Sequence, residues 1–219
     1  MKAMILAAGR GERLRPLTDS LPKPLIEVAG KPIIVYLIES LARAGFCDLV
    51  INLGYLGDKI RTALGNGSQY GVSITYSREP AAALETGGGI FQALPLLSDP
   101  FLVVNGDIAT DFPFQQLPKT IDSKAHLILV PNPRHHPRGD FSLQGGRVGL
   151  EDQPRFTFSG IGIYRKAFFC QCKPGRFSIA PMLLKAAAKG QISGQLYQGL
   201  WSDLGTPQRL QKWRDLLHQ

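Results

Sequence analysis

The sequence predicts an α/β fold: a mainly parallel sheet with helices on both faces, followed by a small β-rich insertion. Two observations support this class. Short apolar runs alternate with segments of helical periodicity as far as residue 130, and from residue 131 the segments become mostly strand-like. The chain has 219 residues, of which 44% are hydrophobic and 19% charged, so it can bury a full core.

In the first part of the chain, strands and helices are expected to alternate. The expected strands are residues 4–8, 48–53, 72–77, 101–104 and 126–130. The expected helices are residues 32–44, 58–64 and 89–97. Pro32 suits a first helical position and Gly45 a helix end, whereas Pro95 should end the regular part of the third helix.

The second part is expected to add strands and a closing helix to the same domain. Gly145-Gly146 predicts a hairpin over residues 140–150, and a strand over 155–164 follows. Further helices are expected over 178–188 and over 207–218, the latter capped by Thr206. Without a repeat or linker, residues 1–219 are predicted to form one domain. Its ligand-binding core is residues 1–130, and residues 131–219 form a lid and closing helix.

Composition restricts the partners and the compartment. The sequence has no apolar run long enough for a membrane span and no signal-peptide pattern, so a cytoplasmic protein without a membrane partner is expected. Three cysteines agree with a reducing compartment. The net charge of +8 raises the possibility of nucleic-acid binding, but the basic residues of the C-terminal third are scattered and lack a recognition pattern. We therefore expect no nucleic-acid partner.

A glycine loop directly follows the first strand and indicates a phosphate site. Gly9 and Gly11 allow backbone N–H groups to approach phosphate oxygens without a Cβ in the way. Arginines follow at positions 10, 13 and 15. Lys23 comes next, held between Pro22 and Pro24, which restrict the backbone on both sides. The spacing favours a polyphosphate ligand.

Two common phosphate loops do not fit this segment. A dinucleotide fingerprint would need a glycine where Leu14 stands, and Pro16 would interrupt its helix. The Gly-Lys-Ser/Thr ending of a P-loop is absent. A nicotinamide-dependent oxidoreductase and an RNA-binding module remain as alternatives. Tight NAD binding without pyrophosphate release would favour the first, and salt-dependent RNA binding would favour the second.

Two aspartates are predicted to hold Mg²⁺. Asp107 follows the buried strand at 101–104, and Asp203 lies in a Trp-x-Asp-x-Gly-Thr turn. A carboxylate beside polyphosphate requires a cation between them, and Mg²⁺ favours one or two carboxylates plus phosphate oxygens. A nucleoside triphosphate carries about four negative charges, which the loop arginines, Lys23 and Mg²⁺ together offset. An anionic phosphate acceptor then needs no general base, because it is already a nucleophile.

Taken together, these segments resemble the sugar-phosphate nucleotidylyltransferases. The matching segments begin at Leu6, Pro22, Asn105 and Trp201, and they occur in the family's order over nearly the whole chain. The resemblance implies a Rossmann-like core, Mg²⁺, and transfer of a nucleotidyl group to a sugar 1-phosphate. It also implies a catalytic role for Lys23 and Arg13 and metal ligation by Asp107 and Asp203. The nucleotide-binding residues that it implies are Ala8, Gly9, Gly11, Glu12, Arg13 and Lys23.

Two further segments resemble one branch of that family, the uridylyltransferases of N-acetylmuramate 1-phosphate. These segments are residues 85–89 (ETGGG) and 132–141 (NPRHHPRGDF). The branch implies UTP as donor, with Glu85 and Gly88 near the uracil, and a role in peptidoglycan recycling. The substrate-binding residues expected for the β-rich, sugar-binding insertion and its surroundings are Asn105, Asp140, Ser159 and Arg138. Glucose, mannose or N-acetylglucosamine 1-phosphate and other nucleotides remain alternatives, and the short chain favours a monomer.

Overall fold

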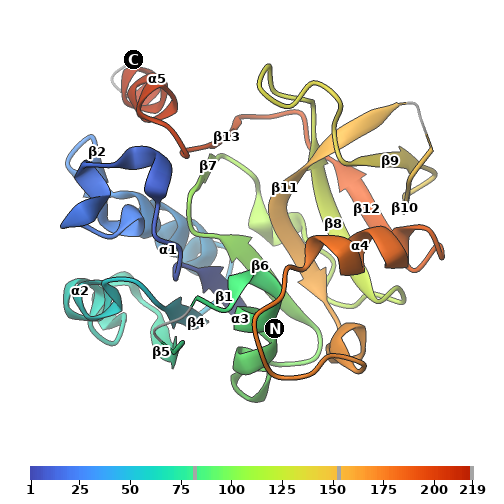
Figure 1. The fold of residues 1–219 in the computed structure, drawn as a ribbon, viewed down its shortest axis with the longest axis horizontal. Coiled ribbons are helices and arrows are strands. Elements are labelled where there is room, and N and C mark those ends of the chain that lie inside the picture. The colour runs from blue at the N-terminus through green and yellow to red at the C-terminus, as the bar shows by residue number, and fades with distance from the viewer. Residues whose placement is uncertain (81–82, 152–153, 218–219) are drawn as a thin grey trace.

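A computed structural model describes residues 1–80, 83–151 and 154–217 (Figure 1). Its main feature is a nine-stranded sheet in the order β5-β4-β1-β6-β11-β8-β12-β10-β9. Five of these strands lie before residue 131: β1 (Ala3–Leu6), β4 (Asp48–Leu53), β5 (Ser73–Arg78), β6 (Phe101–Asn105) and β8 (Ala125–Val130). The remaining strands are β9 (Phe141–Gln144), β10 (Arg147–Gly149), β11 (Arg155–Tyr164) and β12 (Ile192–Leu196).

The α/β class is confirmed, and the sheet is more mixed than the expected mainly parallel one. Strands β5, β4, β1 and β6 run parallel to one another. Strand β11 lies antiparallel to both β6 and β8, and β8 pairs in parallel with β12. A strand from the second part of the chain thus separates two strands of the first part, so the sheet does not divide at residue 130.

Helices cover both faces of the sheet because successive apolar residues of the central strands point to opposite faces. On one face, Ala3 and Ile5 pack with α1 (Ile33–Arg43) and α2 (Gly57–Leu64). On the other face, Met4 packs with α3 (Glu85–Ala93) and α4 (Ala180–Ala187). Strands buried on both faces are typical of parallel sheets and explain the near-continuous apolar runs in the sequence.

Most expected elements are present, with one shift that affects the site. Helix α3 begins at Glu85, four residues before the expected start, so residues 85–89 are its first turn and not a loop. The expectation for Pro95 is confirmed: regular helix ends at Ala93, and Pro95 lies in a short 3-10 turn. The hairpin β9–β10 turns at Gly145 and Gly146, both with positive φ.

A small second sheet joins the C-terminal segment to the middle of the chain. Strand β13 (Trp201–Asp203) pairs antiparallel with β7 (Ile108–Thr110). Helix α5 (Pro207–Leu217) follows, and its buried Leu210 packs with Leu14 and with Val28 of the hairpin formed by β2 (Glu27–Val28) and β3 (Lys31–Pro32). Figure 1 shows α5 beside this hairpin. Among the described residues, no helix has the length and apolar character needed to cross a membrane.

Candidate active site

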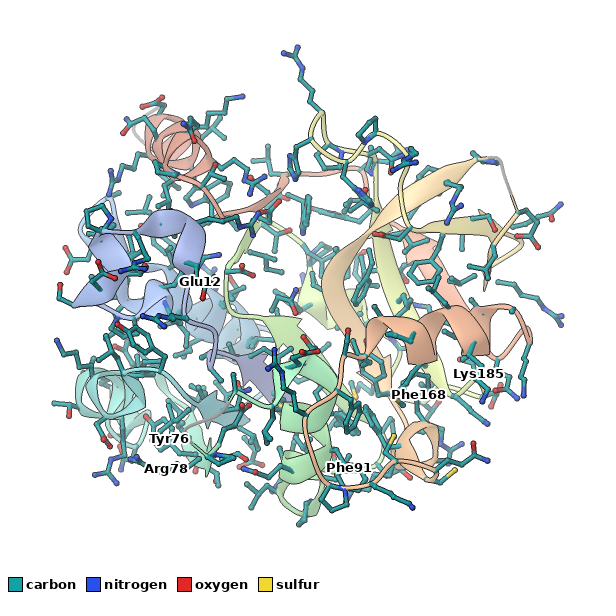
Figure 2. All side chains as sticks on the ribbon, in the orientation of Figure 1. Glu12, Tyr76, Arg78, Phe91, Phe168 and Lys185 are labelled. Atoms are coloured by element: carbon teal, nitrogen blue, oxygen red, sulfur yellow. The ribbon has the colours of Figure 1, made fainter. Side chains whose placement is uncertain are left out.

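A cavity of about 620 Å³ lies at the carboxyl ends of β1 and β6. Ligands of open α/β sheets bind at this edge. Many of the residues predicted from the sequence line the cavity: Ala8, Gly9, Gly11, Glu12, Arg13, Lys23, Glu85, Asn105 and Asp107. Glu12, labelled in Figure 2, lies on the loop that follows β1. The structure therefore brings together residues that are up to 99 positions apart, from Ala8 to Asp107.

The glycine loop needs its second glycine for the backbone shape. Gly11 has φ +68°, in the left-handed region, and its carbonyl accepts a hydrogen bond from Thr18 Oγ1 at 3.0 Å. A Cβ at Gly11 would lie 3.0 Å from Thr18 Cγ2 and 3.1 Å from Lys23 Cβ. At Gly9, in contrast, a Cβ would meet nothing within 4 Å. Gly11 is required by the loop itself, whereas Gly9 leaves space at the cavity wall.

Lys23 and Asp107 form an ion pair inside the cavity. Lys23 begins a 3-10 turn (Lys23–Leu25) and is 8% exposed, and its Nζ lies 2.5 Å from Asp107 Oδ2. Asp107 follows β6, and Gly106 before it donates from its backbone N to Leu6 O at 2.9 Å. Backbone contacts on both sides thus fix where the two charges meet.

Two buried polar residues of the cavity wall were not predicted from the sequence. Asn52 Oδ1 accepts the backbone N–H of Ala7 at 2.7 Å, and Asn52 Nδ2 donates to Glu79 Oε1 at 2.7 Å. Glu79 Oε2 accepts the N–H of Leu84 at 3.0 Å. The available signal was Asn52 itself, a polar residue inside an apolar strand. These bonds tie the end of β1 to the segment that precedes α3.

Glu85 and Gly88 lie differently with respect to the cavity. Glu85 lines the cavity with φ +60°, and its Oε1 lies 2.9 Å from Arg176 Nε. Gly88 does not line it: its N–H donates to Phe177 O at 3.1 Å, and a Cβ there would collide with the Gly175 carbonyl. The glycines of α3 therefore allow residues 175–177 to pack on the helix, which corrects the expectation that Gly88 faces a nucleotide.

Asp203 lies next to Asp107 through the small sheet. The N–H of Leu204 donates to Asp107 O at 2.7 Å. The carboxylate of Asp203 contacts two basic side chains, with Oδ1 2.8 Å from Arg209 Nη2 and Oδ2 3.0 Å from His135 Nε2. Asp203 is not a lining residue of the cavity, although Gly205 is.

Whether Mg²⁺ fits this site depends on how many carboxylates can bind it. Among residues 1–80, 83–151 and 154–217, no group of three or more His, Cys, Asp or Glu is arranged to hold a metal. Mg²⁺ does not need one, because it takes one or two carboxylates and completes its shell with phosphate oxygens and water. Asp107 and Asp203, at the ends of two paired segments, fit that requirement.

The residues predicted to bind the sugar do not all lie at the cavity. Asn105 lines the cavity, beside Gly160, whose φ of +81° and missing Cβ leave space for the Asn105 amide. Asp140 Oδ2 accepts the N–H of Phe158 at 2.8 Å, and Arg138 is exposed on the same loop. Ser159 differs from the expectation. It is 1% exposed, and its hydroxyl donates to Ile128 O at 2.7 Å, so it supports the β11 bulge and does not line the cavity.

Comparison with known proteins decides the family. Residues 2–141 match the nucleotidyl transferase family. The chain belongs to this family. It is 52% identical to the N-acetylmuramate alpha-1-phosphate uridylyltransferase of Neisseria meningitidis serogroup B, across 97% of this chain and 96% of that one. It is 33% identical to the protein of the same name from Caulobacter vibrioides, across 94% and 92% of the two chains.

A more distant relative in sequence and two solved structures with a similar fold are also found. Mannose-1-phosphate guanylyltransferase catalytic subunit beta of Xenopus tropicalis is 30% identical over 94% of this chain and 62% of its own length. The structure of HddC from Yersinia pseudotuberculosis in complex with GMP-PN superposes with a TM-score of 0.83 at 23% identity, covering 99% of each chain. The inositol-1-phosphate CTP transferase from T. maritima gives 0.81 at 20% identity, covering 99% and 94%.

Proposed function

We propose that this nucleotidyl transferase moves UMP from UTP to N-acetylmuramate α-1-phosphate, giving UDP-N-acetylmuramate and pyrophosphate. The observation that carries the reaction is the meeting of the glycine loop, Lys23 and Asp107 in one cavity. The choice of nucleotide and sugar is supported by 52% identity, over nearly the full length of both chains, to an enzyme with that name. The reaction would serve peptidoglycan recycling.

The glycine loop is proposed to hold the triphosphate. Its backbone curves at Gly11, which leaves N–H groups along the loop free of Cβ atoms. Arg13 lines the same cavity and supplies a forked cation that suits phosphate oxygens. The loop thereby places the α-phosphate toward Lys23, deeper in the cavity.

The acceptor needs orientation more than activation. A sugar 1-phosphate is an anion at neutral pH, so its oxygen attacks the α-phosphorus without losing a proton. The bond between the α- and β-phosphates breaks in line with this attack, and pyrophosphate leaves with the electron pair. Catalysis then comes from holding both anions in line and offsetting the charge that develops on the α-phosphoryl oxygens.

Lys23 is proposed as the cation that offsets this charge. Its ammonium is nearly buried, and Asp107 keeps it at a defined place before any substrate binds. A fixed ammonium stabilises the transition state without reorganising during the reaction. Arg13 is proposed to act on the leaving pyrophosphate from the opposite end of the loop.

Asp107 and Asp203 are proposed to hold Mg²⁺. When bound, the ion would supply charge neutralisation at the phosphate oxygens. In the protein without it, Lys23, His135 and Arg209 contact these two carboxylates. The carboxylates are therefore held near cations in either state.

The uracil is proposed to lie against residues 83–86. The Asn52–Glu79 hydrogen bonds fix the segment that leads into α3, and Ala83, Glu85 and Thr86 line the cavity there. On the sugar side, Asn105 is proposed to contact the substrate inside the cavity. Asp140 and Arg138 are proposed to reach it from the loop of residues 131–140, with Arg138 opposite the lactyl carboxylate.

Pyrophosphate release tests this proposal directly. The purified protein is given UTP and Mg²⁺ with the α-1-phosphate of N-acetylmuramate, N-acetylglucosamine, glucose or mannose. We expect release with the muramyl sugar, and none with the others at the same concentration. Release with another sugar alone would discard the muramyl assignment, and silence with every sugar and nucleotide would discard the reaction. Sedimentation of the same sample tests the predicted monomer.

A further inference from the structure

Asp203 lies between two basic side chains that come from different parts of the fold. Arg209 contacts Oδ1 at 2.8 Å from helix α5, and His135 contacts Oδ2 at 3.0 Å from the loop of residues 131–140. Each carboxylate oxygen thus has a different basic partner. The two partners differ in how firmly the fold holds them.

Arg209 is firmly placed. Its side chain is 15% exposed, and its backbone N–H donates to Thr206 Oγ1 at 3.4 Å at the start of α5. The next residue, Leu210, is 3% exposed and packs with Leu204, the neighbour of Asp203. Leu204 and Leu210, the chain neighbours of Asp203 and Arg209, belong to one apolar cluster, so the fold holds the backbones of the two residues close together.

His135 is less constrained. Its side chain is 45% exposed, and it lies on a surface loop between β8 and β9. Loop side chains at the surface change rotamer readily, since few neighbours restrict them. A divalent cation can therefore replace His135 at Oδ2 with little rearrangement of the fold.

Gly205 lies close to two arginine side chains and to the Asp203 carboxylate. A Cβ at Gly205 would lie 2.6 Å from Arg13 Nη2, 2.8 Å from Arg209 Nη2 and 2.9 Å from Asp203 Oδ1. Two guanidinium groups and the Asp203 carboxylate therefore surround the position of Gly205, and of the two arginines only Arg209 is in ion-pair contact with Asp203 among the described residues.

We propose that Arg209 is a positioning residue that holds Asp203 Oδ1 and leaves Oδ2 for the divalent cation, whereas His135 occupies Oδ2 until the cation binds. This rests on the proposed function, in which Asp203 is a metal ligand. Partners of a ligating carboxylate fix its orientation, and their loss costs about 10–100-fold in metal affinity. The two basic side chains thus have opposite effects: Arg209 strengthens cation binding and His135 competes with it.

Direct binding of Mn²⁺ tests the inference without turnover. Free Mn²⁺ is measured by electron paramagnetic resonance in the presence of a UTP analogue with an imido bridge between the α- and β-phosphates. The proteins are wild type, Arg209→Gln, Arg209→Lys, His135→Ala and Lys212→Gln. Lys212 is exposed on the same helix, so its variant controls for the loss of one positive charge. Thermal unfolding of each variant checks that it is folded.

We expect Arg209→Gln to raise the Mn²⁺ Kd about tenfold or more. Arg209→Lys should recover part of the affinity, because it keeps the charge but loses the planar fork. His135→Ala should bind Mn²⁺ at least as tightly as wild type, and Lys212→Gln should match wild type. Unchanged or tighter binding by Arg209→Gln would overturn the positioning role alone, and weaker binding by His135→Ala would overturn the competition. If wild type binds no Mn²⁺, the proposed metal site fails as well.

Discussion

Lys23 Nζ lies 2.5 Å from Asp107 Oδ2, although the two residues are 84 positions apart in the sequence. The side chain of Lys23 is 10% exposed and that of Asp107 is 34% exposed. A nearly buried ammonium would be costly alone, and the carboxylate compensates for its lost hydration. The pair also places a cation where the α-phosphate of a bound nucleotide is proposed to lie.

Replacing Lys23 tests its proposed catalytic role. We expect Lys23→Ala to lower kcat about a hundredfold or more, because a preorganised transition-state contact is lost. The measurement is the rate of pyrophosphate release at saturating substrates, with Lys212→Ala as a control for an exposed lysine. Near-normal turnover of a folded Lys23→Ala protein would remove this residue from the mechanism.

Replacing Asp107 tests the proposed metal site from the other side of the pair. Asp107→Asn keeps the shape of the side chain but removes its charge, so we expect about a hundredfold loss of kcat. Wild-type activity should disappear with a chelator and return with Mg²⁺. Full activity of either Asp107→Asn or the chelated wild type would rule out Asp107 as an essential metal ligand.

Gly9 and Gly11 form a matched pair in the phosphate loop. Gly11→Ala should destabilise the protein by about 1–2 kcal/mol, because alanine at φ +68° is strained and its Cβ would crowd Thr18 and Lys23. Gly9→Ala meets no neighbour, so its unfolding free energy should stay close to that of wild type while KM for UTP rises. Urea unfolding and steady-state kinetics measure the two effects. Equal stability losses in both variants would contradict this assignment.

Arg138 tests the origin of sugar specificity. If it meets the lactyl carboxylate, Arg138→Ala should raise KM for N-acetylmuramate 1-phosphate far more than for N-acetylglucosamine 1-phosphate. Arg134 is exposed on the same loop, and Arg134→Ala serves as the control for general loss of charge. The same change in KM for both sugars would show that Arg138 does not read the lactyl group.

His126 predicts a pH dependence of stability outside the site. Burial lowers the pKa of His126 below its usual value of 6.5, and its Nδ1 lies 2.9 Å from Ser193 Oγ. The unfolded chain therefore binds this proton more readily than the folded one. The free energy of unfolding should fall as the pH drops below about 6.5 and level off below the folded pKa. Chemical unfolding from pH 7.5 to 5 measures this, and a His126→Asn variant with the same slope would contradict it.

Elements were predicted well where local pattern determines them. The apolar runs of β1, β4 and β6 match near-fully buried strands, and Gly145-Gly146 matches the hairpin turn. Helix α3 was placed too late because Gly87, Gly88 and Gly89 have low helix propensity. Their tertiary contacts override that propensity, since a Cβ at Gly89 would collide with the Glu79 carboxylate.

Within the site, residues at special backbone positions were easier to predict than residues whose role depends on a side-chain partner. The phosphate loop and Lys23 were found because glycine and proline mark special backbone positions. Ser159 and Gly88 were misplaced, because a hydroxyl or a glycine in the sequence does not reveal whether it faces a cavity or a neighbouring strand. Asn52 and Glu79 were missed, because a polar residue in an apolar strand does not reveal its partners, which here come from distant segments of the chain.

The sequence by itself determined the α/β class, the order of the main helices and of most strands, the phosphate loop and the family resemblance. These depend on local periodicity, turn residues and short motifs, which need no knowledge of distant contacts. Only the tertiary structure decided that β11 enters the sheet between β6 and β8, that Lys23 pairs with Asp107, and that Arg209 and His135 hold Asp203. Such contacts depend on how strands far apart in the chain pair and how side chains fill the space between them, which no local pattern encodes.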